Sequence, residues 1–410
     1  MLPALETTEY ATEERGGITL PKGFRAAGIH CGVKRMKKDL ALIVSDVPAT
    51  AAAVFTLNRV QAAPVVLSKQ HFATCSKFHA IVINSGNANA CTGEKGFEAA
   101  RAMADVTAQV VGVYPSEVFV ASTGVIGEPL PVEKVVSGIR AAAAFLSAGE
   151  HQNAAEAIMT TDTFVKSASA TFEIDGREVN IGGIAKGSGM IHPNMATMLG
   201  FITTDAAIEP DTFQMLLTET VDRTFNRIVV DGDTSTNDMV VALANGESGI
   251  VPLRPGTAAF RLFAEHFENV LRKLALDIVR DGEGATKLVE IRVEGAMNKG
   301  DALKAAKAVA LSPLVKTAIH GEDANWGRII AAVGYSGIEF NPAEFEIIIN
   351  KLPILGKNFT ISLSNQDANK RLKSDFIELV IRLNGGTGMA TVWTCDFSEQ
   401  YVVINGSYRS

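Results

Sequence analysis

A threonine that follows a glycine- and proline-containing run is the feature of this sequence best suited to chemistry. The run from Lys186 to Ala196 begins polar and glycine-rich, and Thr197 follows it at the head of an apolar stretch. Glycine and proline can hold the backbone in an unusual shape, which a hydroxyl needs to reach the carbonyl of the residue before it. The run therefore has the residues that a chain needs to cut itself between Ala196 and Thr197.

The cut would give Thr197 a free α-amine beside its hydroxyl. An α-amine has an ordinary pKa of about 8, so it can serve as the base that activates the hydroxyl for attack. His192 lies upstream and is an alternative base. After cleavage it would belong to the other fragment, so a structural role is favoured for it. On pattern alone, a glycine-rich turn before an ordinary buried strand is the commoner explanation of the run.

Thr123 and Gly124 form a second candidate, because they directly follow a strand-like run over residues 118–122. A glycine in this place lets a backbone N–H approach a ligand closely, and the threonine hydroxyl adds a second donor. The pair is suited to an oxyanion hole, which stabilises the charge that develops when a carbonyl is attacked. On sequence alone, an ordinary turn from strand to loop is the commoner explanation.

Residues that could hold a small charged substrate lie in four further places. The polar run over residues 160–163 could clamp an amino-acid head group through its hydroxyls. Lys186 could pair with a carboxylate and Glu283 with an ammonium group. The polar C-terminal run over residues 405–410 is the fourth place. Each place also has an ordinary explanation, as a helix end, an exposed loop charge or a frayed terminus.

Composition argues against metal, nucleic-acid and membrane functions. The net charge of −7 does not favour a phosphate-rich partner, and no apolar stretch approaches the roughly 20 residues of a membrane helix. The start of the chain lacks the basic and apolar segments of a secretion signal, which predicts a cytoplasmic protein. The cysteines show no metal-ligand spacing and are expected to be reduced thiols: Cys31, Cys75, Cys91 and Cys395.

The elements that must position these residues alternate between strands and helices. Short runs rich in valine and isoleucine recur along the chain and predict strands, among them 40–45, 118–122, 178–184, 198–203 and 328–333. A helix is predicted over 257–279, because apolar residues recur there at steps of three and four. The fold class is therefore α/β, and 410 residues suffice for two lobes with their own cores.

The run from Lys186 to Leu199 resembles the cleavage segment of the bifunctional ornithine acetyltransferase family, also called glutamate N-acetyltransferase, of arginine biosynthesis. Residues 122–127, Ser-Thr-Gly-Val-Ile-Gly, match a second motif of that family. Residues 84–90, 231–238 and 321–328 also resemble it. The 231–238 run lacks the spacing of a calcium loop, and we interpret it as an ordered turn that supports the site. The resemblance extends from about residue 17 to the C-terminus.

The resemblance implies two α/β lobes in an α-β-β-α sandwich, of the self-cleaving N-terminal-nucleophile type. It implies an alpha chain of residues 1–196 and a beta chain of residues 197–410, assembled as a heterotetramer of two alpha and two beta chains. In the family, the equivalents of Thr123 and Gly124 form the oxyanion hole. By the same matches, the substrate site is lined by Thr160, Lys186, Thr197, Glu283, Asn405 and Ser410. Thr161 is an alternative to Thr160 in this match.

The implied activity is acetyl transfer from N2-acetylornithine to glutamate through an acetyl-threonine ester on Thr197. No metal or bound cofactor is expected, and acetyl-CoA is a possible second acetyl donor, which would make the enzyme multifunctional. One alternative is an N-terminal-nucleophile hydrolase or aminopeptidase of similar fold, with water as the acceptor. Another is a non-catalytic amino-acid-binding protein in which Thr197 is a buried core residue, and an uncut chain would favour it.

Overall fold

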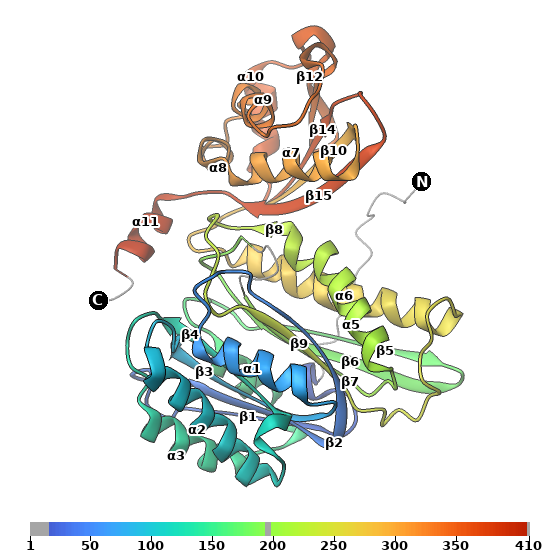
Figure 1. Cartoon of the computed structure of the whole chain (residues 1–410). Coiled ribbons are helices and arrows are strands. Elements are labelled where there is room, and N and C mark those ends of the chain that lie inside the picture. The colour runs from blue at the N-terminus through green and yellow to red at the C-terminus, as the bar shows by residue number, and fades with distance from the viewer. Residues whose placement is uncertain (1–15, 193–197, 408–410) are drawn as a thin grey trace.

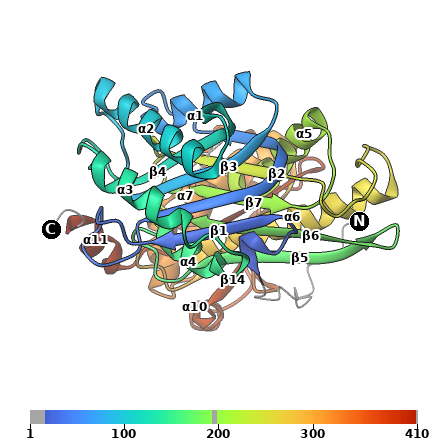
Figure 2. The same ribbon diagram turned by 90° about the horizontal axis from the view of Figure 1, so that it is seen from below.

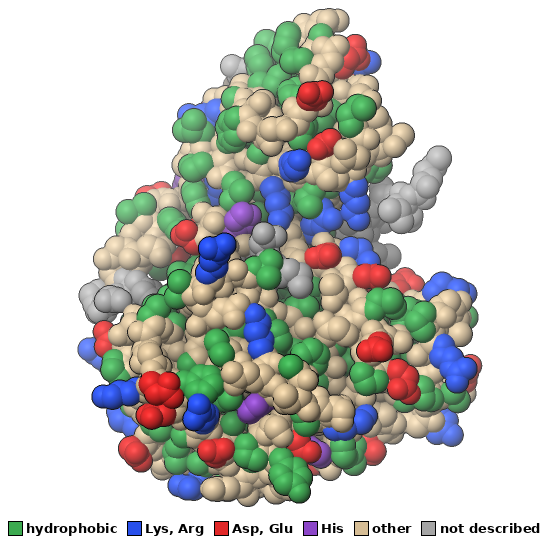
Figure 3. Space-filling model, in the orientation of Figure 1, with side chains coloured by type: hydrophobic (Ala, Val, Ile, Leu, Met, Phe, Trp, Pro, Cys, Tyr) green, Lys and Arg blue, Asp and Glu red, His purple; other side chains and the backbone are tan. Residues whose placement is uncertain are grey.

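The computed structural model describes residues 16–192 and 198–407 of the chain, and these form two lobes (Figure 1). The first lobe is built on an eight-stranded sheet and the second on a seven-stranded sheet. Figure 3 shows Lys and Arg side chains gathered at the waist between the lobes, whereas acidic and basic side chains are interspersed over the first lobe. No helix in the described ranges is long and apolar enough to cross a membrane.

The sheet of the first lobe has the strand order β4-β3-β2-β9-β7-β6-β5, with β1 paired to β2. Strand β2 spans 16 residues, and its register against β3 shifts between Val44 and Ala49. Its first half pairs with β1 and β3 and its second half with β9, so one strand joins two halves of the sheet. The strands are β1 (Phe24–Ile29), β2 (Leu40–Phe55), β3 (Phe78–Asn87), β4 (Val118–Val125), β5 (Lys166–Ile174), β6 (Arg177–Lys186), β7 (Leu199–Thr204) and β9 (Met239–Ala244).

The two halves of this sheet stack on each other, because alternate side chains of β2 face different cores. Ala41 and Ile43 share a buried cluster with Phe201 of β7, which lies between the halves. Leu40 and Leu42 instead pack with side chains of α2 and α3 on one outer face. The opposite outer face packs against α5 and α6. The helices are α1 (Ala63–Thr74), α2 (Gly93–Val111), α3 (Val132–Ala143), α4 (His151–Ile158), α5 (Pro210–Arg223) and α6 (Ala258–Arg280).

This order of layers confirms the predicted α/β class and places the α-β-β-α sandwich within the first lobe. Seen from below, α1, α2 and α3 gather at one end of the lobe, and β5 and β6 lie toward the other (Figure 2). The predicted helix over 257–279 is confirmed as α6, where Thr257 Oγ1 accepts a hydrogen bond from the Phe260 N–H at 3.1 Å. That bond satisfies one of the free N–H groups at the helix start.

The second lobe has the strand order β13-β12-β11-β14-β10-β15-β8. Its strands are β8 (Ile228–Val229), β10 (Leu288–Ala296), β11 (Glu346–Ile349), β12 (Leu352–Gly356), β13 (Thr360–Ile361), β14 (Phe376–Arg382) and β15 (Gly388–Cys395). Its helices are α7 (Lys299–Leu311), α8 (Pro313–His320), α9 (Trp326–Gly334) and α10 (Asn365–Asn369). The last helix, α11 (Glu399–Gly406), projects from this lobe beside the first one (Figure 1).

The prediction of a strand over residues 328–333 is wrong, because these residues lie in helix α9. The Asn325 side chain caps that helix by accepting from the Arg328 N–H at 3.2 Å. A short apolar run can form either a buried strand or a buried helix. Here the N-terminal cap and the packing against α7 favour the helix. The predicted strand over 178–184 is confirmed within β6, and the one over 198–203 largely as β7.

Candidate active site

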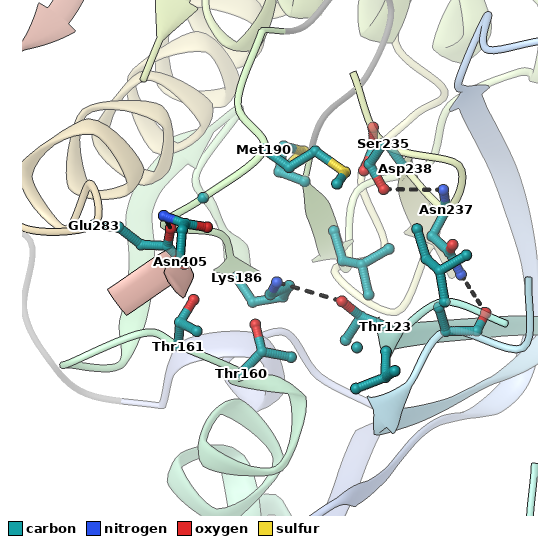
Figure 4. Close-up of a pocket in the computed structure, with 17 residues that line it drawn as sticks. Thr123, Thr160, Thr161, Lys186, Met190, Ser235, Asn237, Asp238, Glu283 and Asn405 are labelled. Atoms are coloured by element: carbon teal, nitrogen blue, oxygen red, sulfur yellow. Dashed lines mark hydrogen bonds between the residues drawn. The ribbon is translucent and has the colours of Figure 1, made fainter. Parts of the chain in front are cut away.

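A pocket of about 280 Å³ opens where β4, β6, the loop before β9, the loop after α6 and helix α11 meet (Figure 4). Ala196, Thr197 and Ser410 lie outside the described residues. All the other predicted site residues line this one pocket, although they come from segments far apart in the chain: Thr123, Gly124, Thr160, Lys186, Glu283 and Asn405. Thr161, the alternative to Thr160, and Met198 line it as well.

Gly124 stands at a place where only glycine fits. Strands β3 and β4 run parallel and bring Gly124 opposite Gly86. The φ angle of Gly124 is +132°, and a Cβ there would lie 2.3 Å from the carbonyl carbon of Gly86. Any side chain would therefore force the two strands apart. The glycine keeps the backbone beside Thr123 within reach of the pocket.

Lys186 ends β6 and points toward Thr123 (Figure 4). Its Nζ donates a hydrogen bond to Thr123 Oγ1 at 3.3 Å. Burial lowers the pKa of the Lys186 ammonium, and the charge of Asp162 partly offsets that effect. Lys186 as a whole is 8% exposed, and it lines the pocket. Its amino group is therefore available to an anionic group of a ligand.

Asp162 was not singled out in the sequence, yet it fixes two sides of the pocket. Its Oδ2 accepts from the Thr160 N–H at 2.8 Å, and its Oδ1 accepts from the Gly187 N–H at 2.7 Å. Burial raises the pKa of Asp162, but Lys186 and Lys166 lower it more, and the net pKa is well below the ordinary value. The carboxylate is therefore ionised and orients the Thr160 turn against the start of the glycine run.

Lys166 forms ion pairs with two buried carboxylates behind the pocket. Its Nζ lies 2.7 Å from Asp162 Oδ1 and 2.5 Å from Asp281 Oδ2, and the lysine side chain is fully buried. Removing one member of such a buried set leaves uncompensated charge, which costs far more than the set contributes when complete.

Replacing Lys166 by methionine should therefore lower the free energy of unfolding by about 3–5 kcal/mol, because Asp162 and Asp281 lose the ammonium group that contacts both of them. Urea unfolding at neutral pH measures the change. Lys95→Met is the matched control, since Lys95 is exposed, and its effect should stay within about 0.5 kcal/mol. A loss for Lys166→Met no larger than that of the control would contradict the assignment.

Glu283 and Asn405 bring the far end of the chain to the pocket. The Glu283 N–H donates to the Ser188 carbonyl at 2.9 Å, and Asn405 Nδ2 donates to Glu283 Oε2 at 2.8 Å. A Cβ on Gly189 would lie 2.5 Å from the Glu283 carboxyl, so that residue must be small. The glycine run, the end of α6 and helix α11 are thus fitted together around one carboxylate.

The chain just before the undescribed residues 193–197 is held by the loop before β9. Asp231 accepts from the N–H groups of Met190 at 2.6 Å and Ile191 at 2.8 Å. Thr234 Oγ1 donates to the His192 carbonyl at 3.2 Å, and His192 Nδ1 lies 3.2 Å from the Gly232 carbonyl. Burial, aided by Lys307, lowers the pKa of His192. These contacts agree with the structural role that is favoured for His192.

The same loop also carries a side chain of the pocket wall. Asn237 Nδ2 donates to the carbonyls of Ala88 at 2.6 Å and Ser122 at 2.8 Å, which ties the loop to β4 just before Thr123. Asp238 follows and lines the pocket. The sequence indicated a supporting turn here, and it gave no signal that Asp238 faces the site.

The arrangement offers one amino group and two carboxyl groups, those of Lys186, Glu283 and Asp238, around hydroxyl and backbone donors. Such a lining suits a small ligand that carries both carboxylate and amine groups. Among residues 16–192 and 198–407, no group of three or more His, Cys, Asp or Glu side chains could hold a metal ion.

Comparisons with known proteins agree with this reading of the pocket. The model of the ArgJ family matches residues 25–410. The arginine biosynthesis bifunctional protein ArgJ of Symbiobacterium thermophilum is 52% identical over 96% of this chain and 99% of its own length. The protein of the same name from Listeria monocytogenes serotype 4b is 50% identical over 97% of this chain and 99% of its own. A crystal structure of ArgJ from Bacillus halodurans is 44% identical with a TM-score of 0.50, covering 52% of this chain and all of that one.

Proposed function

This chain belongs to the ArgJ family, and from that premise we propose how its pocket moves an acetyl group. The protein is an acetyltransferase of arginine biosynthesis, and relatives that are about half identical to it are named bifunctional. The proposal concerns which residues carry the reaction and which substrates they take. It rests on one observation: side chains from β4, β6, the loop after α6 and helix α11 line a single pocket beside Met198.

We propose that Thr197 is the nucleophile, after the chain has cut itself at Ala196–Thr197. Its hydroxyl attacks the acetyl carbonyl of N2-acetylornithine, and ornithine leaves with a proton from the Thr197 amine. An acetyl ester remains on Thr197. Glutamate then enters the same pocket, and its amine takes the acetyl group. The ester divides one difficult exchange between amides into two easier steps.

Thr123 and Gly124 supply the oxyanion hole in this proposal. Because Lys186 Nζ donates to Thr123 Oγ1, the threonine oxygen is occupied as an acceptor, and its own O–H is directed elsewhere. The Gly124 N–H would provide the second donor to the same oxyanion. The lysine thus orients the hydroxyl and also adds positive charge near the developing negative charge.

Lys186 and Glu283 are proposed to divide substrate recognition between them. N2-acetylornithine and glutamate share an α-carboxylate, which suits Lys186, and they differ in the charge of their side chains, which would face Glu283. No bound cofactor is proposed. Acetyl-CoA is proposed as a second donor, because the relatives are named bifunctional. A cytoplasmic heterotetramer of two alpha and two beta chains stays a prediction.

Lys186→Ala should therefore slow both half-reactions, and Glu283→Ala should slow the first more than the second. A carboxylate attracts the cationic side chain of N2-acetylornithine and repels the anionic side chain of glutamate. Loss of a charged hydrogen-bond partner would cost on the order of 1.5–3 kcal/mol in the affected step. Single-turnover kinetics separate acetyl-enzyme formation from its discharge by glutamate. Equal losses in both steps for Glu283→Ala would show that its charge does not discriminate between the substrates.

Intact mass under denaturing conditions tests the proposed function directly. The purified protein should give two fragments that meet at Ala196–Thr197. After incubation with N2-acetylornithine, the fragment that begins at Thr197 should gain the mass of one acetyl group. Glutamate should remove that group faster than water does, with N-acetylglutamate as the product. An uncut chain, or an acetyl group lost equally fast without glutamate, would contradict the proposal.

A further inference from the structure

Asp238 is a buried acid of the pocket that the proposed mechanism does not use. It is 3% exposed and lies on the wall opposite Glu283 and Asn405 (Figure 4). Its Oδ2 is buried and has no hydrogen-bond partner in the described part of the chain. A buried polar atom without a partner costs free energy, typically about 1–3 kcal/mol and more when it is charged. Such an atom calls for an explanation in a ligand or in catalysis.

The backbone on both sides of Asp238 is held by hydrogen bonds, which fixes the place from which its side chain enters the pocket. The Thr56 N–H donates to the Asp238 carbonyl at 2.9 Å, and Asn237 is tied to Ala88, just after β3, and to Ser122 of β4. The Met239 N–H donates to the Met198 carbonyl at 3.2 Å, which continues the parallel pairing of β7 with β9. Asp238 therefore lies close to Met198, the residue that comes directly after Thr197 in the sequence.

The charged groups that line the pocket limit which hydrogen-bond donors can reach Asp238 Oδ2. Lys186 is the cation of the lining, and it donates to Thr123 rather than to Asp238. Burial raises the pKa of Asp238 well above the ordinary value, and Ser235 and Lys186 offset this only in part. A carboxyl of raised pKa is poor at holding a permanent charge and well matched to taking up a proton from an amine.

We propose that Asp238 is a further catalytic residue, whose unpaired Oδ2 takes the proton of an ammonium group in this pocket and leaves a free amine. The inference rests on the proposed acetyl transfer, because that reaction needs a neutral amine. Two sources of the amine share this chemistry: the acceptor amino acid, and the terminal amine that self-cleavage would create.

For the acceptor, the step balances as follows. The ammonium gives one proton to the Asp238 carboxylate and becomes an amine. The amine nitrogen bonds to the carbonyl carbon of the acetyl ester, and the bond from that carbon to the threonine oxygen breaks. The threonine oxygen takes the second proton that leaves nitrogen, and Asp238 returns its proton to solvent. For the terminal amine, proton transfer to Asp238 leaves that amine neutral, so that it can act as the base for the hydroxyl.

Asp238→Asn keeps the shape of the side chain and removes the proton acceptor. Single-turnover kinetics over neutral to alkaline pH, with glutamate or hydroxylamine as the acceptor, test the idea, because hydroxylamine is already unprotonated at neutral pH. Discharge by glutamate should fall about 10²-fold at neutral pH, the usual contribution of a general base. The loss should shrink as pH rises. Lys186 and Glu283 also face the pocket and are unchanged in the variant, so differences between the pH profiles report Asp238.

The two amine sources give different results. If the acceptor amine is the source, discharge by hydroxylamine and formation of the acetyl-enzyme stay at wild-type rates. If the terminal amine is the source, both half-reactions slow with both acceptors, again less at high pH. Rates equal to wild type, or a loss that is the same at every pH, would overturn the proposal. The control is Asp233→Asn, an exposed acid of the same loop, which should match the wild-type enzyme.

A second variant keeps the test decisive if Asp238→Asn is not cut. Asp238→Ala leaves room for a formate ion, which can replace the missing carboxylate. Formate should restore cutting or discharge in this variant, and it should not change the wild-type rates. A folded Asp238→Ala protein, with its melting temperature near that of wild type, that formate does not rescue would overturn the inference. Acetyl-enzyme formation by the wild-type enzyme tests the proposed function separately.

Discussion

Thr197→Ala should give a single uncut chain that forms no acetyl-enzyme. Without the hydroxyl there is no nucleophile for the Ala196 carbonyl or for the acetyl group of the substrate, so both reactions lose their first step. The effect should be complete in both assays. A denaturing gel reads the cutting, and intact mass after incubation with N2-acetylornithine reads the acetyl group.

Thr197→Ser is the matched control, because serine keeps a hydroxyl at the same position, and it should still cut and still accept an acetyl group. In the wild-type protein the two fragments should stay together under native conditions. Strand β6 lies in the first fragment and pairs with β7 of the second along its length, from Ile181 with Thr204 to Lys186 with Leu199. Normal cutting of Thr197→Ala would show that another group attacks the Ala196 carbonyl.

The parts of the site that the sequence predicted are those in which one short segment carries both the backbone shape and the functional group. Thr123 and Gly124 are such a case, since a strand running into a glycine already suggests a backbone donor at a strand end. Glu283 and Asn405 needed the family resemblance, because each by itself reads as a loop acid or a terminal amide. Their shared hydrogen bond joins residues far apart in the chain, and no local pattern encodes it.

The residues that the sequence missed act through distant partners. Asp162 holds Thr160 and Gly187, and it is neutralised by Lys166, which also serves Asp281. Asp238 lay within a recognised run, but only its burial beside the start of β7 gives it a place in the pocket. Buried charges cannot be told from exposed ones by residue type, because the fold alone decides which of them lose water.

The fold shows the same division between local and distant information. The apolar steps of three and four predicted α6 almost to its ends, because one face of that helix packs against the sheet. The order of the strands could not be predicted, since β2 changes partners halfway along its length and thereby creates the sandwich. Periodicity reports which side of an element is buried and not which element covers it.

Thr123→Ala should lower kcat by about 10²–10³-fold, or about 2.7–4 kcal/mol, and leave KM little changed. The hydroxyl is a donor to an oxygen that becomes negative only when the carbonyl is attacked, so its loss raises the barrier more than it weakens substrate binding. The backbone should survive the change, because β4 keeps its pairing with β3 through main-chain bonds. Steady-state and single-turnover kinetics of both half-reactions measure the effect.

Thr123→Ser separates the oxyanion role from a role in packing, because serine retains the donor and loses only a methyl group. It should keep most of the rate. The two variants also differ in their effect on Lys186. In Thr123→Ala the Lys186 Nζ loses its hydrogen-bond acceptor, whereas in Thr123→Ser it keeps one. If Lys186 acts on the oxyanion mainly by orienting the Thr123 hydroxyl, Lys186→Ala should cost less in the Thr123→Ala background than in wild type. A Thr123→Ala effect confined to KM, or Thr123→Ser as slow as Thr123→Ala, would show that the hydroxyl does not stabilise the transition state.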